Sequence, residues 1–384
     1  MGFEIRSAQL NEFEEATNLI NEVFRISINE KPTMVDEFPL LLNKSNMKNM
    51  IMGIKDEKIV TCVSYLTQEI FIQGNVIKVG FIGGVCTHPN YEGKGFASQT
   101  LDFAENQMIE EGIDVISISG TRSLYTRRNC SMVKSFYKYT INKKYIDLNL
   151  DISIKDFDDK DIDKYIQLYN QSSTRFLRSK SQFNILLESA TIPWGTYSYK
   201  KLSIIKNDEI IGYVVLRIID EKERYGKVIE AVLDNKYKTD IFRTIANKYD
   251  LDYIILHVHV KDYNNHFDGY DKKELDFQGG TLKVINFEKL MNSLKMYFNQ
   301  YVKDELLKCI KFIQKNNKYI IEYEEKENSI KEEFIIEDID ELNKLLFEYN
   351  EENYVRLSHL KYIQKFIKSV FPIDFVWTEN LNYQ

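Results

Sequence analysis

The sequence has few of the residues and patterns that mark several common classes of protein. Its 384 residues include only four cysteines, and no two of them form a CxxC pair. This spacing argues against a zinc ribbon or a disulfide framework and favours a reducing, cytoplasmic compartment. No apolar run reaches the roughly 18 residues that a membrane span needs, and the first residues lack the long apolar run of a secretory signal.

Positive charge is also scarce. The formal net charge is −7 at pH 7, so a broad electrostatic contact with nucleic acid is not expected. Hydrophobic residues make up 43% and charged residues 28% of the chain, a composition typical of a globular protein. Only five prolines occur, so long extended linkers between domains are not expected.

Hydrophobic periodicity divides the chain into three segments, each long enough for a domain: 1–146, 147–279 and 280–384. The first is expected to contain a strand, a helix and four further strands, then a glycine-rich loop, a helix at 97–111 and a strand at 113–119. The second repeats this order loosely, with a helix at 238–249. The third is expected to begin with a strand and a long helix from Phe287, followed by charged strands and a last helix. The pattern predicts a mixed α+β protein.

The most informative stretch is VCTHPNYEGKGFAS, residues 85–98. Its closely spaced glycines precede an amphipathic helix, as they do in phosphate-binding loops. A P-loop is excluded because His88 stands where the first glycine should be and Gly95 follows Lys94. A dinucleotide fingerprint fits Gly93 and Gly95, but Ser98 replaces the third glycine. An acyl-CoA pyrophosphate loop and an ordinary tight turn between strand and helix remain as alternatives.

The acyl-CoA alternative has a direct physical basis. Successive main-chain N–H groups at the start of a helix can converge on phosphate oxygens, and the positive end of the helix dipole adds to that attraction. Glycine lets the anion approach closely and permits a positive φ. The residues that would form this cradle are Gly93, Lys94, Gly95, Phe96, Ala97 and Ser98.

The stretch resembles motif A of the GCN5-related N-acetyltransferases, the GNAT superfamily. The superfamily pattern Arg/Gln-x-x-Gly-x-Gly/Ala aligns with Glu92 to Ala97, although Glu92 departs from the usual residue and is expected to point outward. The resemblance implies that acetyl-CoA is the cosubstrate. It also implies that strand residues Val85, Cys86 and Thr87 border the pantetheine, with main-chain hydrogen bonds from Val85 and Thr87.

A second matching stretch, SGTRSLYTRRNC, follows the predicted strand at 113–119. The superfamily often has LYxKxGF here, with a tyrosine close to the sulfur of CoA. The resemblance implies that Gly120 and Thr121 border the cosubstrate and that Tyr125 is the general acid. A phenol of pKa about 10 can protonate a leaving thiolate. The alternative is that Tyr125 only packs, as one of the 25 tyrosines of the chain.

The three-segment layout resembles the enhanced intracellular survival protein family. That family has two tandem GNAT-like domains followed by a sterol-carrier-protein-like α/β domain, and its relatives are often oligomers. The resemblance implies that the terminal carboxylate, here that of Gln384, reaches the active site as a base or anchor. The second segment has no glycine loop between Asp234 and Phe242, so we expect it to bind no CoA.

Other candidate groups carry weaker signals. His257 and His259 alternate along a predicted strand and share a face, but no cysteine or acid stands at ligand spacing, so no metal site is expected. Cys86 has no identifiable base that would make it a nucleophile. Three acidic residues before FPLLL could attract a cationic amine or could simply be surface residues: Glu30, Asp36 and Glu37.

These observations predict an acetyl-CoA-dependent N-acetyltransferase. The acceptor would be a primary amine on a small molecule, such as an aminoglycoside or polyamine, or a lysine side chain, and the transfer would be direct. The partners expected are this amine and other copies of the chain, with neither nucleic acid nor a membrane. Two alternatives stay open, a non-catalytic CoA sensor and a carrier of apolar ligands.

Overall fold

The computed structural model describes residues 2–144, 152–192, 196–262, 270–350 and 356–383. The chain divides into two compact units. The first comprises Met1–Val133, Gly279–Ile373 and Tyr383–Gln384, and the second comprises Lys134–Gln278 and Asp374–Asn382. Each unit is therefore built from separate parts of the sequence.

The first unit is built on a mixed sheet with the strand order β1-β2-β3-β4-β5-β14. All neighbours are antiparallel except β4 and β5, which are parallel. The strands are β1 Phe3–Ser7, β2 Met50–Lys55, β3 Lys58–Ile72, β4 Asn75–Thr87, β5 Val115–Ile118 and β14 Thr281–Val284. The sequence suggested two separate strands where β3 is one continuous strand.

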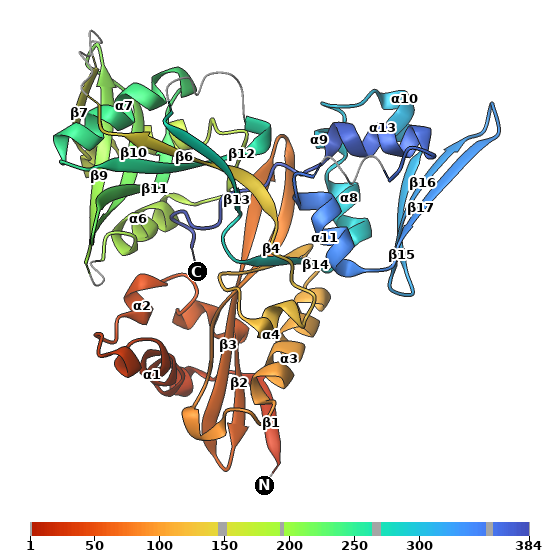
Figure 1. Cartoon of the computed structure of the whole chain (residues 1–384). Coiled ribbons are helices and arrows are strands. Elements are labelled where there is room, and N and C mark those ends of the chain that lie inside the picture. The colour runs from red at the N-terminus through yellow and green to blue at the C-terminus, as the bar shows by residue number, and fades with distance from the viewer. Residues whose placement is uncertain (1, 145–151, 193–195, 263–269, 351–355, 384) are drawn as a thin grey trace. The chain divides into compact units, whose positions relative to one another are not determined.

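Helices cover both faces of this sheet (Figure 1). α1 (Phe13–Phe24) packs Ala16 and Ile20 against one face, and α3 (Phe96–Glu110) packs Leu101, Ala104 and Met108 against the other. The three α3 residues recur at helical spacing, which is why the sequence predicted this helix almost to the residue. The short helices α2 (Met34–Glu37) and α4 (Ser123–Thr126) complete this part of the unit.

The remainder of the first unit follows β14 in the sequence. A second, antiparallel sheet of β15 (Ile310–Lys315), β16 (Lys318–Glu325) and β17 (Ile330–Ile336) is accompanied by short helices. The predicted long helix from Phe287 is wrong, because the chain forms three short helices there. The helices are α8 Phe287–Ser293, α9 Lys295–Phe298, α10 Asp304–Lys308, α11 Ile339–Phe347 and α13 Lys361–Val370.

The second unit has its own seven-stranded sheet, in the order β13-β6-β12-β11-β10-β9-β7. Its only parallel neighbours are β11 and β12 among the described strands. The strands are β6 Lys134–Asn142, β7 Ile152–Asp156, β9 Tyr197–Lys206, β10 Glu209–Asp220, β11 Arg224–Val232, β12 Tyr253–His259 and β13 Lys272–Phe277. The short strand β8 (Thr174–Phe176) is not part of this sheet.

The part of the second unit that the structure describes has three α-helices. α7 (Asn235–Lys248) packs Ile241, Phe242 and Ile245 into the main core of the unit, and the residues of β11 and β12 lie in the same cluster. The other two helices are α5 Ile162–Tyr169 and α6 Lys180–Ser189. The short 3-10 segments of the described residues are η1 Leu10–Glu12, η2 Ile26–Ile28, η3 Lys44–Asn49, η4 Pro89–Tyr91, η5 Asp159–Asp161 and η6 Val260–Asp262.

The units differ from the predicted segments. The boundary expected between 146 and 147 lies outside the described residues, whereas the structure changes unit at Val133 and Lys134. The strand expected to open a third domain is β14, and it pairs with β5 of the first sheet, from Thr281 with Ile118 to Val284 with Val115. Division into three domains, with a sterol-carrier-like third, stays a prediction.

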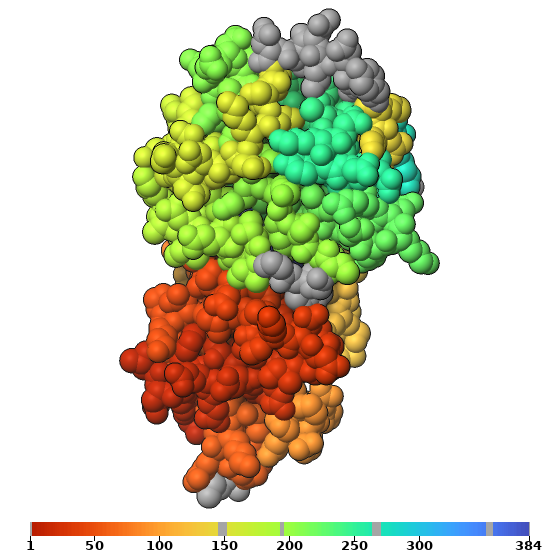
Figure 2. Space-filling view, turned by 90° about the vertical axis from the view of Figure 1, so that its left-hand side faces the viewer, coloured from red at the N-terminus to blue at the C-terminus, as the bar shows by residue number. Residues whose placement is uncertain are grey.

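The surface of the first unit includes a continuous face formed by the first fifty residues, which are red in Figure 2. This face contains α1, α2 and the short segments around them. Among the described residues, no helix combines the length and the apolar character that crossing a membrane would require.

Candidate functional site

The candidate site begins where the parallel strands of the first sheet stop pairing. β4 and β5 are paired as far as Ile82 and Ile118, and β4 then continues to Thr87. Beside this extension the pairing of β4 with β3 shifts in register, and Gly84 lies in the shift with a φ of +61°. Because such a bulge bends a strand, the extension of β4 is directed away from the regular ladder.

Hydrogen bonds on the β3 side show which way the main chain of the extension faces. The carbonyl of Cys86 accepts a hydrogen bond from a threonine hydroxyl of β3 at 2.7 Å, and the N–H of His88 donates to a β3 carbonyl at 2.9 Å. Successive residues of a strand direct their main-chain groups to opposite edges. Val85 and Thr87 therefore direct theirs to the edge away from β3, where β5 has ended.

The glycine loop connects this extension to α3. Gly93 and Gly95 have φ values of +73° and +78°, a region that side chains disfavour, and Gly95 is the N-cap of α3. A Cβ on Gly93 would meet no atom within 4 Å, so the loop borders open space. The N–H groups of Phe96, Ala97 and Ser98 occupy the first turn, where a helix offers them no internal acceptor.

Two side chains of the loop are engaged locally. The Lys94 ammonium donates to the Asn90 carbonyl at 3.0 Å and lies 4.8 Å from the ring centre of Tyr91. The Phe96 ring stacks on Phe3 of β1, with 4.2 Å between ring centres. The loop therefore presents main-chain N–H groups to open space, while Lys94 and Phe96 are engaged in local contacts.

Tyr125 is buried close to the end of the paired strands. It belongs to the same core cluster as Val85, Ile118 and Cys130 and is 5% exposed. Gly120 makes room for its ring, since a Cβ there would lie 2.8 Å from a ring carbon of Tyr125. The packing of Tyr125 therefore explains why this residue is glycine, independently of any ligand contact.

The surroundings of Tyr125 keep it protonated. Burial raises its pKa above the ordinary value near 10, Arg122 lowers the pKa, and the thiols of Cys130 and Cys86 raise it. The phenol is therefore a proton donor throughout the neutral range.

Thr121, the neighbour of Arg122, is exposed.

Cys86 is not an activated nucleophile. It is 3% exposed and lies directly opposite Cys62 in the pairing of β3 with β4. Burial raises the pKa of its thiol well above the ordinary value, whereas reactive cysteines have lowered pKa values. The side chain of Cys86 is part of the core.

Two arginines near α3 and α4 contact other side chains of the first unit. The Arg128 guanidinium pairs with Asp102 at 2.6 Å and Glu105 at 2.9 Å, both on α3. The Arg122 guanidinium lies 5.8 Å from the ring centre of Phe24. Arg128 thus ties α3 to the segment that carries Tyr125, while Arg122 is exposed.

The acidic residues singled out in the sequence are not equivalent. Glu37 is bonded in bidentate fashion to Arg25 and accepts a hydrogen bond from the Thr33 hydroxyl. Its charge is therefore compensated, which weakens the idea that it attracts an amine. Glu92 is exposed, in agreement with the expectation that it points outward.

The end of the chain returns to the first unit. Gln384 lies outside the described residues. The preceding residue, Tyr383, belongs to the first unit, and its ring centre lies 6.1 Å from that of Phe38, which follows α2. The chain end is thereby brought to the helical face that contains α1 and α2.

The two histidines lie on β12 of the second unit, and they contact different partners. His257 stacks on Trp377 with 4.0 Å between ring centres, and its Nε2 lies 3.2 Å from Asp276. His259 is 2% exposed, with Nδ1 at 3.2 Å from Asp374. Within the described part of the chain, no group of three or more His, Cys, Asp or Glu is placed to hold a metal ion.

The burial of His257 predicts acid sensitivity of the second unit. Burial and the ammonium of Lys227 lower its pKa to about 4, against 6.5 in the unfolded chain, although Asp276 raises it. The unfolded chain therefore binds the extra proton first, and stability present above pH 6.5 is lost as the pH falls towards 4. At pH 5 we expect a loss of about 2 kcal/mol in the free energy of unfolding.

Urea unfolding at pH 7.5 and pH 5, followed by tryptophan fluorescence, measures this effect. The variant His257→Gln is expected to lose most of the difference between the two pH values. The exposed residue His359 supplies the control, His359→Gln, which should keep it. An unchanged difference in His257→Gln would assign the acid sensitivity to other groups.

Comparisons with known proteins agree with the geometry of the first unit. Residues 4–133 match the family model described as "Acetyltransferase (GNAT) domain". No curated protein sequence matches the chain. Residues 4–133 are therefore an acetyltransferase domain of the GNAT superfamily.

Solved structures share the fold over nearly the whole chain. A GCN5-related N-acetyltransferase from Anabaena variabilis has a TM-score of 0.65 at 14% identity, with 95% of this chain and 96% of that one covered. A probable N-acyltransferase from Enterococcus faecalis has a TM-score of 0.63 at 12% identity, covering 94% and 93%. Eis1 from Mycobacterium abscessus has a TM-score of 0.57 at 13% identity, covering 99% and 98%. At these identities the likeness shows a common fold.

Sequence reasoning missed one buried group of the second unit. Arg178 pairs with Glu230 through two hydrogen bonds of 3.0 and 2.7 Å, and Tyr213 donates to the same carboxylate at 2.7 Å. Arg178 also bonds to Asn382, near the chain end. No spacing rule links these residues, because they are far apart in the sequence and meet only in the folded unit.

Proposed function

We propose that the protein is an acetyl-CoA-dependent N-acetyltransferase that acylates a primary amine. The observation that carries the proposal is the extension of β4 beyond β5 next to the glycine loop at the start of α3. An exposed strand edge can accept the amide groups of pantetheine, and the first turn of α3 can hold the diphosphate. The GNAT family match of this segment supports the same assignment.

The residues have the following proposed roles. The thioester of acetyl-CoA supplies the acyl group. Val85 and Thr87 offer main-chain groups to pantetheine, and the N–H groups from Gly93 to Ser98 hold the diphosphate. A main-chain N–H near Val85 stabilises the oxyanion that forms when the amine attacks the carbonyl carbon.

The proton transfers can be stated for both leaving and attacking groups. The C–N bond forms in the attack, and the C–S bond breaks when the tetrahedral intermediate collapses, as Tyr125 gives its hydroxyl proton to the departing sulfur. The attacking nitrogen loses a proton to water or to the terminal carboxylate of Gln384. The buried phenol is suited to this role because its pKa is raised and it stays protonated.

The variant Gly95→Asp tests the diphosphate cradle. Aspartate tolerates the positive φ of this position, but its carboxylate would stand where the anion binds. We expect the Kd for CoA to rise about tenfold or more, measured by isothermal titration calorimetry. Gly112, at the other end of α3, has a φ of +70° and provides the matched control Gly112→Asp, which should bind CoA normally.

The outcome separates the enzyme from its alternatives. If both variants bound CoA with the same affinity, the start of α3 would not be the diphosphate site. Normal CoA binding without thiol release, with every amine of a polyamine and aminoglycoside panel, would favour a non-catalytic CoA sensor. A co-purified apolar ligand without any CoA affinity would favour a carrier.

A further inference from the structure

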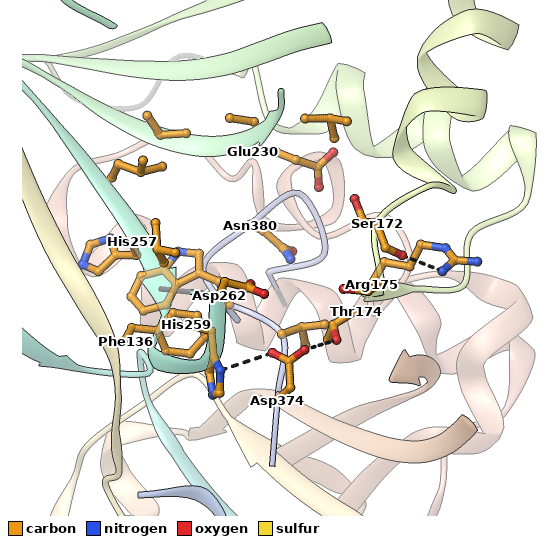
Figure 3. A pocket seen from close by; sticks show the side chains of 18 of the residues that line it. Phe136, Ser172, Thr174, Arg175, Glu230, His257, His259, Asp262, Asp374 and Asn380 are labelled. Carbon is orange, nitrogen blue, oxygen red and sulfur yellow. Dashed lines mark hydrogen bonds and ion pairs between the residues drawn. The ribbon is translucent and has the colours of Figure 1, made fainter. Parts of the chain in front are cut away.

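The second unit contains a cavity at the place where its own parallel strands stop pairing. β11 and β12 pair only from Tyr225–Lys227 with Tyr253–Ile255, and both strands continue beyond this ladder. A cavity of about 330 Å³ lies beside these extensions, and all the residues that line it belong to the second unit (Figure 3). This volume is in the range of small-molecule sites.

The start of the helix that follows β11 is not suited to a diphosphate. The helix that follows β11 is capped by Asp234, whose carboxylate accepts a hydrogen bond from the N–H of Lys236 at 3.1 Å and pairs with its ammonium at 2.7 Å. The N-cap of this helix is therefore a carboxylate, whereas the N-cap of α3 is a glycine without a side chain. The second unit retains the strand geometry of the first but offers a different chemistry.

Carboxylates from three parts of the chain border the cavity. Glu230 of β11 and Asp262, which ends η6, point into it in Figure 3, and Asp374 belongs to the segment from Asp374 to Asn382. Two of these carboxylates, Glu230 and Asp374, are held in place by other side chains. Glu230 is fixed by Arg178 and Tyr213.

Asp374 is fixed at one wall of the cavity. The Thr174 hydroxyl donates to its Oδ2, and its Oδ1 lies 3.2 Å from His259 Nδ1. Asp262 is exposed to solvent. A ligand would thus meet two carboxylates whose positions are already set, which lowers the cost of ordering them, and a third that is accessible.

Arg178 compensates the charge of Glu230, so Asp262 and Asp374 supply the negative charge of the cavity. Arg175 points away from the cavity centre and donates to the carbonyl of Ser172 at 2.8 Å (Figure 3). Lys238 borders the cavity.

Aromatic side chains also line the cavity. Trp377 is in edge contact with Phe136, with 5.0 Å between ring centres, and stacks on His257. All three residues line the cavity. Such a wall can pack against an alkyl chain and attract a cation through the faces of its rings.

We propose that this cavity binds a small organic cation with N–H donors, an alkylammonium compound of diamine size, with an ammonium group near Asp262 and Asp374. The compact size, the accessible carboxylate and the aromatic wall together define this class of ligand. The proposal concerns the second unit alone and does not depend on acyl transfer in the first.

A matched series of ligands tests the charge requirement. The probes are 1,5-diaminopentane, 1,5-pentanediol and glutarate, which share a five-carbon chain and differ in the charge of their ends. The full-length protein is titrated with each by calorimetry at low salt, and the fluorescence of Trp377 is followed in parallel, with Trp377→Phe identifying its signal. We expect saturable binding of the diamine, at least about tenfold tighter than that of the diol or of glutarate.

Variants at Asp262 locate the binding. Asp262→Asn is expected to weaken diamine binding about tenfold, and Asp262→Glu, which keeps the charge, should restore most of it. Asp208→Asn, in the exposed turn between β9 and β10, is the control and should bind normally. CoA affinity should be the same in all of them.

Several results would overturn the proposal. Binding of the diol or of glutarate as tight as that of the diamine would show that charge does not select the ligand. Diamine binding that is absent, or equal in Asp262→Asn, would show that the cavity is not the site. Loss of diamine binding in Gly95→Asp would place the ligand in the first unit instead.

Discussion

Replacing Tyr125 by phenylalanine is expected to lower kcat for acyl transfer by about 10²–10⁴-fold, the usual contribution of a general acid. The ring would still fill its place beside Gly120 and Val85, so the fold and the affinity for CoA should change little. Only the proton donor is removed. The measurement is the rate of thiol release from acetyl-CoA with an amine acceptor, together with the Kd for CoA by calorimetry.

The matched control is Tyr319→Phe. Tyr319 is also a partly buried tyrosine of the first unit, but it lies on β16 in edge contact with Phe287. Its replacement should leave kcat unchanged. If Tyr125→Phe turns over as fast as the unmodified protein, Tyr125 only packs, and the proton must come from elsewhere. An equal loss in both variants would point to a general effect on stability.

Replacing Arg178 by methionine is expected to lower the free energy of unfolding of the second unit by about 3–5 kcal/mol, the cost of leaving a buried charge without its partner. The side chains of Arg178 and Glu230 are 1% and 8% exposed. The variant also loses the hydrogen bond to Asn382, which helps to hold the segment before the chain end.

Urea unfolding followed by tryptophan fluorescence measures this effect in one unit. Trp377 lies in the second unit, so its signal follows that unit. The control is Lys180→Met, which breaks the exposed pair with Asp163 and should cost less than about 1 kcal/mol. The double variant Arg178→Met, Glu230→Met should regain much of the loss, because no buried charge is then left unpaired.

If Arg178→Met were as stable as Lys180→Met, the buried pair would contribute nothing beyond an exposed one. If the double variant were no more stable than Arg178→Met, the loss would come from packing rather than from the uncompensated carboxylate. These outcomes separate the charge of Glu230 from the shape of the side chains around it.

The local features of the candidate site could be predicted because they depend on neighbours in the sequence. The burial of Leu101, Ala104 and Met108 follows from helical spacing. The positive φ angles of Gly93 and Gly95 follow from the need to turn tightly at the start of a helix. Family resemblance supplied the candidate Tyr125, and the structure places it in the core cluster that contains Val85.

Contacts between distant segments could not be predicted in this way. β14 completes the first sheet by pairing with β5, although more than 160 residues separate Thr281 from Ile118. The strand β6 joins the second sheet instead of the first. Alternating hydrophobic residues predict a strand but say nothing about its partner, because any free edge offers the same main-chain hydrogen bonds.

By itself the sequence determined the glycine loop, the helix that follows it and the separation of the chain into strand-rich segments, since these follow from local periodicity and from the conformations that glycine permits. Only the tertiary structure decided the cavity of the second unit. Glu230, Asp262 and Asp374 border it from separate parts of the chain. Their meeting depends on which strands pair and on where the segment Asp374–Asn382 packs, and these are set by burial and hydrogen bonding over the whole fold.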